Sequence, residues 1–102
     1  MQERRKAERF RTNLNVRWES LGSQGRGSVC DLSSTGCFVL TGGEVTPREL
    51  IRLELVGPEE ITPLWGHVIY QIREMGFAVR FAVTRDDERE SIARLIAGLV
   101  QH

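Results

Sequence analysis

The sequence has few of the features on which export, membrane insertion and disulfide scaffolds depend. Its 102 residues include two cysteines, and no apolar run approaches the roughly 18–20 residues of a membrane span. The first six residues, Met1 to Lys6, lead into polar positions and lack the apolar region of a signal peptide. We therefore expect a cytoplasmic protein without membrane insertion, in which Cys30 and Cys37 are reduced thiols.

Catalytic and metal-binding motifs are also missing. His67 and His102 are the only histidines, and neither an H-E-x-x-H nor a C-x-x-C spacing occurs. Glycine-rich phosphate-binding loops are absent, and the acidic run at residues 86–90 is explained by the start of a solvated helix. An enzyme needs an acid, base or nucleophile gathered in a pocket. The sequence therefore predicts no enzyme, no metal and no cofactor.

The net charge of zero conceals an uneven distribution. The first 17 residues carry six basic and two acidic side chains, whereas the remaining 85 carry eight basic and twelve acidic ones. A basic segment on an acidic body indicates that the segment binds an anion. A basic tail that is merely solvated is the alternative, and charge by itself favours it.

Alternating apolar residues predict a single, strand-rich domain over residues 1–102. From Thr12 onward, Leu14, Val16 and Trp18 point to one side and polar residues to the other. Turn residues separate this run from five similar runs farther along the chain. Pro63 predicts an edge, a bend or a bulge in the fifth of the six predicted strands. The predicted strands cover residues 12–19, 26–31, 37–41, 49–56, 61–72 and 75–83.

The period changes near the C-terminus. Apolar residues there follow the spacing of one helix face, at positions 92, 95, 96, 99 and 100. Thr84 and Asp87 have the spacing of a capping box, so we expect a helix over residues 85–100. The predicted fold is mostly β: a six-stranded antiparallel β-barrel over residues 12–83, covered by a C-terminal amphipathic α-helix. Residues 1–11 are expected to form a flexible basic arm.

Two polar clusters remain after this assignment, and the first lies in the arm. Arg4, Arg5 and Arg9 bring three guanidinium groups together, with Arg5 and Arg9 four residues apart. A guanidinium is a planar fork of donors that can grip a phosphate or pair with the O6 and N7 acceptors of guanine. Taken alone, these arginines are as readily explained by solvation.

The second cluster is the turn Asp31-Leu32-Ser33-Ser34-Thr35-Gly36. A carboxylate at Asp31 could accept hydrogen bonds from the N1 and N2 donors of guanine, and Ser33 adds a hydroxyl. Gly36 would let a ligand approach the backbone closely. Taken alone, Asp31 and Ser33 could equally cap a turn.

Together, Arg5-x-x-x-Arg9 and Asp31-x-Ser33-x-x-Gly36 resemble the PilZ domain family, and the resemblance covers essentially the whole chain. It implies a six-stranded barrel with a C-terminal helix and a receptor for cyclic di-GMP, a bacterial second messenger. It also implies that the protein has no catalytic activity and acts in trans on an unidentified effector protein. The ligand-binding residues that it implies are Arg4, Arg5, Arg9, Asp31, Ser33 and Gly36.

Further expectations follow from this resemblance. An arginine directly before the first motif, here Arg4, implies two stacked ligand molecules for each protomer. We expect the arm to become ordered across the barrel when the ligand binds. The family places an aromatic residue near the ligand in some members, but for Tyr70, Trp18 and Trp65 packing in or on the barrel is the simpler expectation.

Two other functions remain open at this stage. A small OB-type barrel could bind nucleic acid, which would need exposed aromatics beside basic residues on a strand face. The chain has 7% aromatic residues and an acidic body, so no DNA or RNA partner is expected. A PilZ-like protein-interaction module that does not bind the nucleotide is the other possibility.

Overall fold

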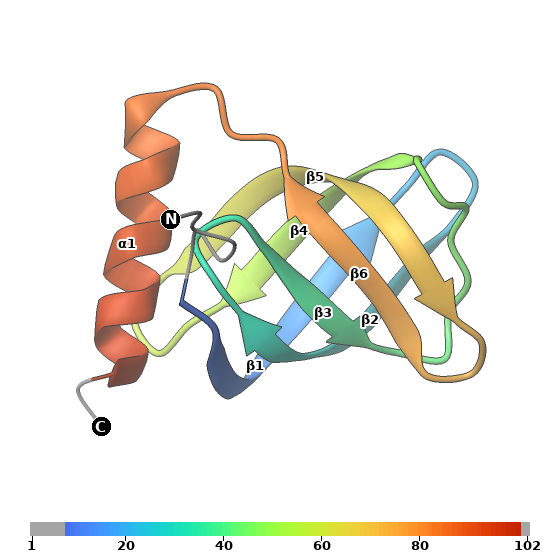
Figure 1. Cartoon of the computed structure of the whole chain (residues 1–102), viewed down its shortest axis with the longest axis horizontal. Coiled ribbons are helices and arrows are strands. Elements are labelled where there is room, and N and C mark those ends of the chain that lie inside the picture. Colours follow the sequence, from blue (N-terminus) through green and yellow to red (C-terminus); the bar gives the residue numbers. More distant parts are fainter. Residues whose placement is uncertain (1–7, 101–102) are drawn as a thin grey trace, which may run out of the picture.

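The computed structural model describes residues 8–100, which form six strands and a C-terminal helix (Figure 1). Arg4, Arg5 and the other residues up to position 7 lie outside the described part of the chain. The elements are β1 (Phe10–Glu19), β2 (Gln24–Leu32), β3 (Gly36–Leu40), β4 (Leu50–Val56), β5 (Ile61–Ile72), β6 (Gly76–Phe81) and α1 (Asp86–Val100).

The six strands close into an antiparallel barrel in the order β1-β2-β3-β6-β5-β4, which confirms the predicted fold class (Figure 1). β1 closes the barrel because it pairs with β2 on one side and with β4 on the other. Closure leaves no continuous strand edge exposed. Pro63 lies in the first half of β5, which pairs with β4 alone, because pairing with β6 begins only at Gly66. A proline can be accommodated there, since that part of β5 has a neighbouring strand on one side only.

The barrel interior is the hydrophobic core, and strand alternation fills it. Leu14, Val16 and Trp18 of β1 all point inward, as predicted. The indole of Trp18 meets the ring of Phe77 edge to face, with 5.4 Å between the ring centroids. Such burial of large apolar side chains is the main stabilising contribution in a domain of this size.

Strand boundaries differ from the prediction at both ends of the barrel. β1 begins at Phe10, so residues 10 and 11 belong to the barrel and not to the arm. The reason is pairing with β2, where Phe10 faces Leu32 and Arg11 faces Asp31. The alternation seen in the sequence misses these residues because a register shift separates Arg11 from Leu14. β6 ends at Phe81, two residues before the predicted end.

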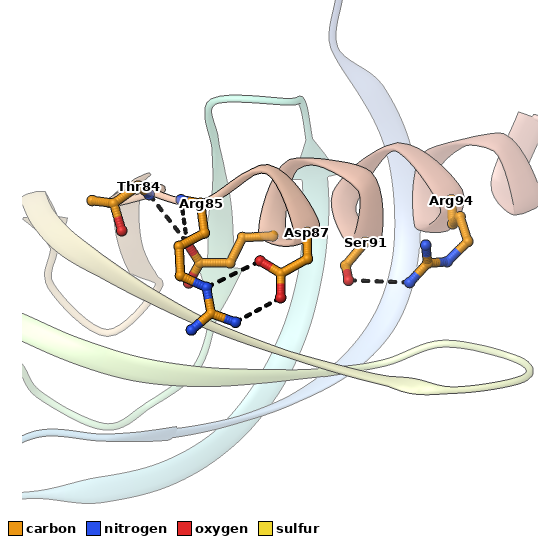
Figure 2. A network of polar contacts seen from close by, with 6 residues as sticks. Thr84, Arg85, Asp87, Ser91 and Arg94 are labelled. Carbon is orange, nitrogen blue, oxygen red and sulfur yellow. Dashed lines mark hydrogen bonds and ion pairs between the residues drawn. The ribbon is translucent and has the colours of Figure 1, made fainter.

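α1 stands against one end of the barrel and buries Ile92 and Leu95 of its apolar face (Figure 1). The predicted Thr84–Asp87 capping box is wrong. One carboxylate oxygen of Glu88 instead accepts hydrogen bonds from the backbone N–H groups of Thr84 and Arg85, at 3.1 and 3.0 Å (Figure 2). This satisfies two backbone donors that the helix start leaves unpaired.

Asp87 is engaged by Arg85 instead. The guanidinium of Arg85 grips the carboxylate of Asp87 through two contacts of 3.1 and 2.6 Å (Figure 2). This hydrogen-bonded pair holds the pKa of Asp87 below its ordinary value. The stabilisation is therefore present above the unfolded-state pKa of Asp87 and is lost as the pH falls through the folded-state value.

Glu74, in the turn between β5 and β6, has a φ of 64°, which side-chain-bearing residues adopt at a steric cost of about 1–2 kcal/mol. We expect Glu74→Gly to raise the free energy of unfolding by roughly 0.5–1 kcal/mol in urea denaturation, since glycine loses only part of that gain to chain entropy. Arg73→Gly is the matched control, because its φ is not positive, and it should lower stability. A Glu74→Gly protein less stable than wild type would contradict the prediction.

Candidate functional site

A groove of about 1060 Å³ lies on the outer face of the barrel, where strands β3, β5 and β6 meet α1. It collects residues from distant parts of the sequence, which the closed barrel brings to one place. The polar and aromatic residues that line it include Arg9, Asp31, Ser33, Ser34, Thr35, Phe38, Tyr70, Arg80, Phe81 and Arg89.

Ser33 builds the turn between β2 and β3 that forms one wall of the groove. Its side chain is buried, and its hydroxyl oxygen accepts hydrogen bonds from the backbone N–H groups of Thr35 and Gly36 at 3.2 and 3.3 Å. The backbone N–H of Ser33 donates to the carbonyl of Gly36 at 2.9 Å. In this structure Ser33 therefore acts as a turn-forming residue that fixes the shape of the wall.

Gly36 begins β3 directly opposite Arg80 of β6. A Cβ atom at Gly36 would collide with the carbonyl oxygen of Val79. The backbone N–H of Phe81 also donates to the carbonyl of Thr35 at 2.8 Å, which ties the turn to the end of β6. Close approach of the neighbouring strand is thus a reason for glycine here in addition to the turn and to the space for a ligand that the sequence predicts.

Arg9 and Asp31 meet at the mouth of the groove. Asp31 lies on β2, and the guanidinium of Arg9 lies 3.4 Å from its carboxylate. The side chains are 66% and 35% exposed, so solvent weakens this ion pair to about 1 kcal/mol or less. Asp31 does not cap the turn in the described structure, because the turn's hydrogen bonds run to Ser33. The ion pair can therefore break at a small cost in free energy, which leaves both groups available to a ligand.

Aromatic side chains form the floor of the groove. Phe38 of β3 and Tyr70 of β5 flank Ala78 of β6, since both are its register partners. Their ring centroids are 6.3 Å apart with an interplanar angle of 42°. The small side chain of Ala78 leaves the two rings as a surface on which a flat base can stack. Tyr70, expected to pack in or on the barrel, lies exposed on its surface and lines the groove.

Two cations of the groove were missed from the sequence. Arg80 stands on the outer face of β6 beside Gly36, and Arg89 reaches the groove from α1. Arg89 is also 3.3 Å from Asp86, which neutralises part of its charge. Arg80 makes no ion pair within residues 8–100. Its neighbours Val79 and Phe81 are buried, so Arg80 points outward, and the register with β3 places it in the site.

The structure thus brings four of the six predicted site residues together: Arg9, Asp31, Ser33 and Gly36 line one groove. Arg4 and Arg5 lie outside the described residues. Arg9, expected in a mobile arm, is placed against the barrel by Asp31.

Cys37 lines the groove, and Cys30 directly precedes Asp31 in the sequence. Cys30 and Cys37 are free thiols, and burial, with the nearby Asp31 carboxylate, raises the pKa of Cys37. A thiol of this kind is a poor nucleophile. Over residues 8–100, no group of three or more His, Cys, Asp or Glu side chains is arranged to hold a metal ion. In the same part of the chain, no helix combines the length and apolar character of a membrane span.

Solved structures with the same fold include two isolated domains. The PilZ domain of YcgR from Escherichia coli, solved with c-di-GMP, has a TM-score of 0.83 at 16% sequence identity, covering 97% of this chain and 93% of that one. The PilZ domain of CeSA from a cellulose-synthesizing bacterium has a TM-score of 0.77 at 19% identity, covering 93% and 99%. At these identities the two structures establish a shared fold.

A third similar structure belongs to a longer protein. The Bacillus subtilis inhibitor of motility, MotI or DgrA, has a TM-score of 0.75 at 16% identity over 97% of this chain, but this chain spans only 52% of that one. No curated protein sequence matches the chain.

Sequence and fold point to the same family. The model of the PilZ domain matches residues 3–98, which is nearly the whole chain and includes both polar clusters. The closed six-stranded barrel with a C-terminal helix agrees with the solved PilZ domains. The chain belongs to the PilZ domain family.

Proposed function

We propose that this protein is a receptor for cyclic di-GMP that binds the nucleotide in the groove and then regulates an effector protein in trans. The observation that carries this proposal is the exposed Arg9–Asp31 pair at the mouth of the groove. A guanidinium and a carboxylate that neutralise each other only weakly are complementary to the phosphate and the N1–N2 edge of a guanine nucleotide. The YcgR structures of the same family contain c-di-GMP.

Each wall of the groove has a separate task in this proposal. Arg9 binds a phosphate or the O6 and N7 atoms of one guanine, and Asp31 accepts from the N1 and N2 donors of another. Ser33 keeps the turn in shape. Phe38 and Tyr70 offer a stacking surface, and Arg80 adds a cation close to Gly36.

The arm supplies the output. Arg4 and Arg5 precede Arg9 in the sequence, and in this proposal they bind the same ligand as Arg9. Binding then orders the arm across the barrel and presents a new surface to the effector protein. No catalytic step is part of this function.

Isothermal titration calorimetry with cyclic di-GMP tests the proposal. A single-stranded oligonucleotide serves as the comparison, because the exposed Trp65 and Tyr70 on β5 are the feature that the OB-type alternative needs. Binding of cyclic di-GMP but not of the oligonucleotide supports the receptor. Tight oligonucleotide binding without cyclic di-GMP binding supports the alternative, and binding of neither supports a protein-interaction module.

The stoichiometry of the same titration tests the role of Arg4. We expect two ligand molecules for each wild-type chain and one for Arg4→Ala, because the extra guanidinium can stack on or pair with a second guanine. Arg73→Ala removes a cation from the β5–β6 turn and should leave the ratio at two. A wild-type ratio of one would refute the stacked pair and leave the receptor proposal intact.

A further inference from the structure

Exposed apolar side chains gather along β5 and directly beside it. Among the residues that the structure describes, eight large hydrophobic ones are exposed, and seven of them lie on β5, at the start of β4 or in the β5–β6 turn. These seven are Leu50, Ile61, Trp65, Ile69, Tyr70, Ile72 and Met75. The eighth, Leu21, lies apart in the β1–β2 turn. Such clustering marks an interaction surface, whereas scattered exposed residues do not.

The cluster follows from the alternation of β5. Its inward positions, among them Leu64 and Val68, are buried in the core. The outward positions that alternate with them form a nearly apolar row, which we name the β5 stripe: Ile61, Pro63, Trp65, His67 and Ile69. A solvated strand face is ordinarily polar. Trp65, expected to pack in the barrel, is 46% exposed in this row.

The stripe is large enough for a protein partner. From Ile61 to Ile69 it covers nine residues, which corresponds to roughly 26 Å of strand. With Leu50 and Tyr70 beside it, the exposed apolar area is on the order of several hundred Å², similar to the ~800 Å² that each partner contributes to a standard interface. The tryptophan at its centre is of the residue type that most often dominates interface energies.

The stripe is nearly symmetric about Trp65. Pro63 and His67 lie two residues away on either side, and Ile61 and Ile69 lie four residues away. A two-fold interface requires a surface that is complementary to itself. If two stripes pack face to face with their strands antiparallel, each isoleucine at one end meets the isoleucine at the other end of the second copy. We infer that the β5 stripe is the interface of a two-fold symmetric homodimer.

The charges at the two ends select this antiparallel arrangement. Arg48 lies beside the Ile69 end, where its backbone N–H donates to the carbonyl of Val68 at 2.6 Å. Glu59 lies two residues before Ile61 at the other end. Both are exposed, and neither makes an ion pair within residues 8–100. Antiparallel packing brings Arg48 toward Glu59 of the partner subunit, whereas parallel packing would oppose like charges.

Arg52 does not prevent this packing. It is the register partner of Trp65, so two copies of Arg52 approach each other near the two-fold axis. Part of its charge is offset within its own chain, because its guanidinium donates to the carboxylate of Glu54 at 2.9 Å, a carboxylate that Arg17 also approaches at 3.8 Å. Its alkyl stem can therefore pack beside the tryptophan while its guanidinium keeps a carboxylate partner at the centre of the interface.

Sedimentation equilibrium of the full chain, without nucleotide, tests the dimer independently of ligand binding. Over roughly 5–500 µM protein we expect a reversible monomer–dimer equilibrium, with a heavy species of twice 11.6 kDa. Trp65→Thr should raise the dissociation constant about 30-fold or more, and Ile61→Thr should raise it less. Both positions point outward, and threonine suits a strand, so circular dichroism should show folded variants.

The matched control is Leu21→Thr, which removes an exposed leucine outside the stripe and should leave the dissociation constant unchanged. Arg48→Glu and Glu59→Arg should each weaken the dimer, and combining them should restore it. Wild-type protein that stays monomeric at roughly 500 µM would overturn the inference, as would dimerisation that survives both Trp65→Thr and Ile61→Thr. A failure of the charge exchange to restore the dimer would overturn the antiparallel arrangement.

Discussion

Replacing Arg9 by alanine is expected to weaken cyclic di-GMP binding roughly ten- to hundredfold and to leave the stability of the barrel nearly unchanged. The loss in affinity reflects a charge-assisted hydrogen bond worth about 1.5–3 kcal/mol. Stability changes little because the Arg9–Asp31 pair is largely exposed and contributes at most about 1 kcal/mol. Calorimetric titration gives the affinity, and urea denaturation gives the free energy of unfolding.

Asp31→Ala should weaken binding to a similar extent for a different reason. It removes the acceptor for the guanine N1 and N2 donors, and it also releases Arg9 from its partner in the free protein. The effects of the two substitutions on the binding free energy are therefore expected to be non-additive. The reason is that each substitution removes the ion-pair partner of the other residue in the free protein. A double-mutant cycle measures this coupling.

The chain offers a matched control for Arg9 in Arg17. Arg17 forms a comparable exposed pair with Glu54, at 3.8 Å, and its side chain is 62% exposed. It lies on β1 and does not line the groove. Arg17→Ala should therefore leave the affinity for cyclic di-GMP unchanged. If Arg9→Ala binds as wild type does while remaining folded, the assignment of the groove as the binding site is wrong.

The regular part of the fold could be predicted from the sequence because strand and helix periods differ. Leu14, Val16 and Trp18 alternate in the sequence and all reach the core, and Ile92 and Leu95 are buried on one face of α1. Local spacing carries this information because each inward side chain alternates with an outward one. Closure into a barrel was inferred from the number of strands, and the β1–β4 pairing bears it out.

What could not be predicted depends on partners that are distant in the sequence. The bulge in β1 moves Phe10 into the barrel, and only the register with Leu32 reveals this. The residues that flank Trp65 in the sequence resemble those that flank a core residue. Trp65 is exposed because it lies on the face of β5 that points out of the barrel. Arg80 enters the groove because β6 lies next to β3, although 44 residues separate it from Gly36.

The groove and the β5 stripe share one end. Ile69 closes the stripe and also lines the groove, and Tyr70 follows it on the groove side. A ligand that stacks on Tyr70 would therefore lie beside the end of the dimer interface. This proximity is possible because β5 is a long strand of a closed barrel. The outward side chains of its first part form the stripe, and Tyr70 near its end lines the groove. We therefore expect ligand binding and dimerisation to be coupled directly at these two side chains.

Gly36→Ala is expected to destabilise the barrel by about 1–3 kcal/mol or more, because the added Cβ would meet the carbonyl oxygen of Val79. The obstacle is the backbone of the neighbouring strand β6, which cannot swing aside as a flexible side chain can. Adjustment would stretch the strand pairing between Gly36 and Arg80, and with it the hydrogen bond from Phe81 to Thr35. Urea denaturation measures the loss as a lower midpoint.

Gly22→Ala is the control for this substitution, because a Cβ at Gly22 meets no atom within 4 Å. Neither glycine has a positive φ, so the two variants differ in the space available and not in backbone strain. Gly22→Ala should be neutral or stabilising by about 0.4–1 kcal/mol. If Gly36→Ala is as stable as wild type but binds cyclic di-GMP more weakly, the glycine serves ligand approach and not strand packing. If it is less stable and the folded fraction still binds with wild-type affinity, Gly36 shapes the site only through the position of β6.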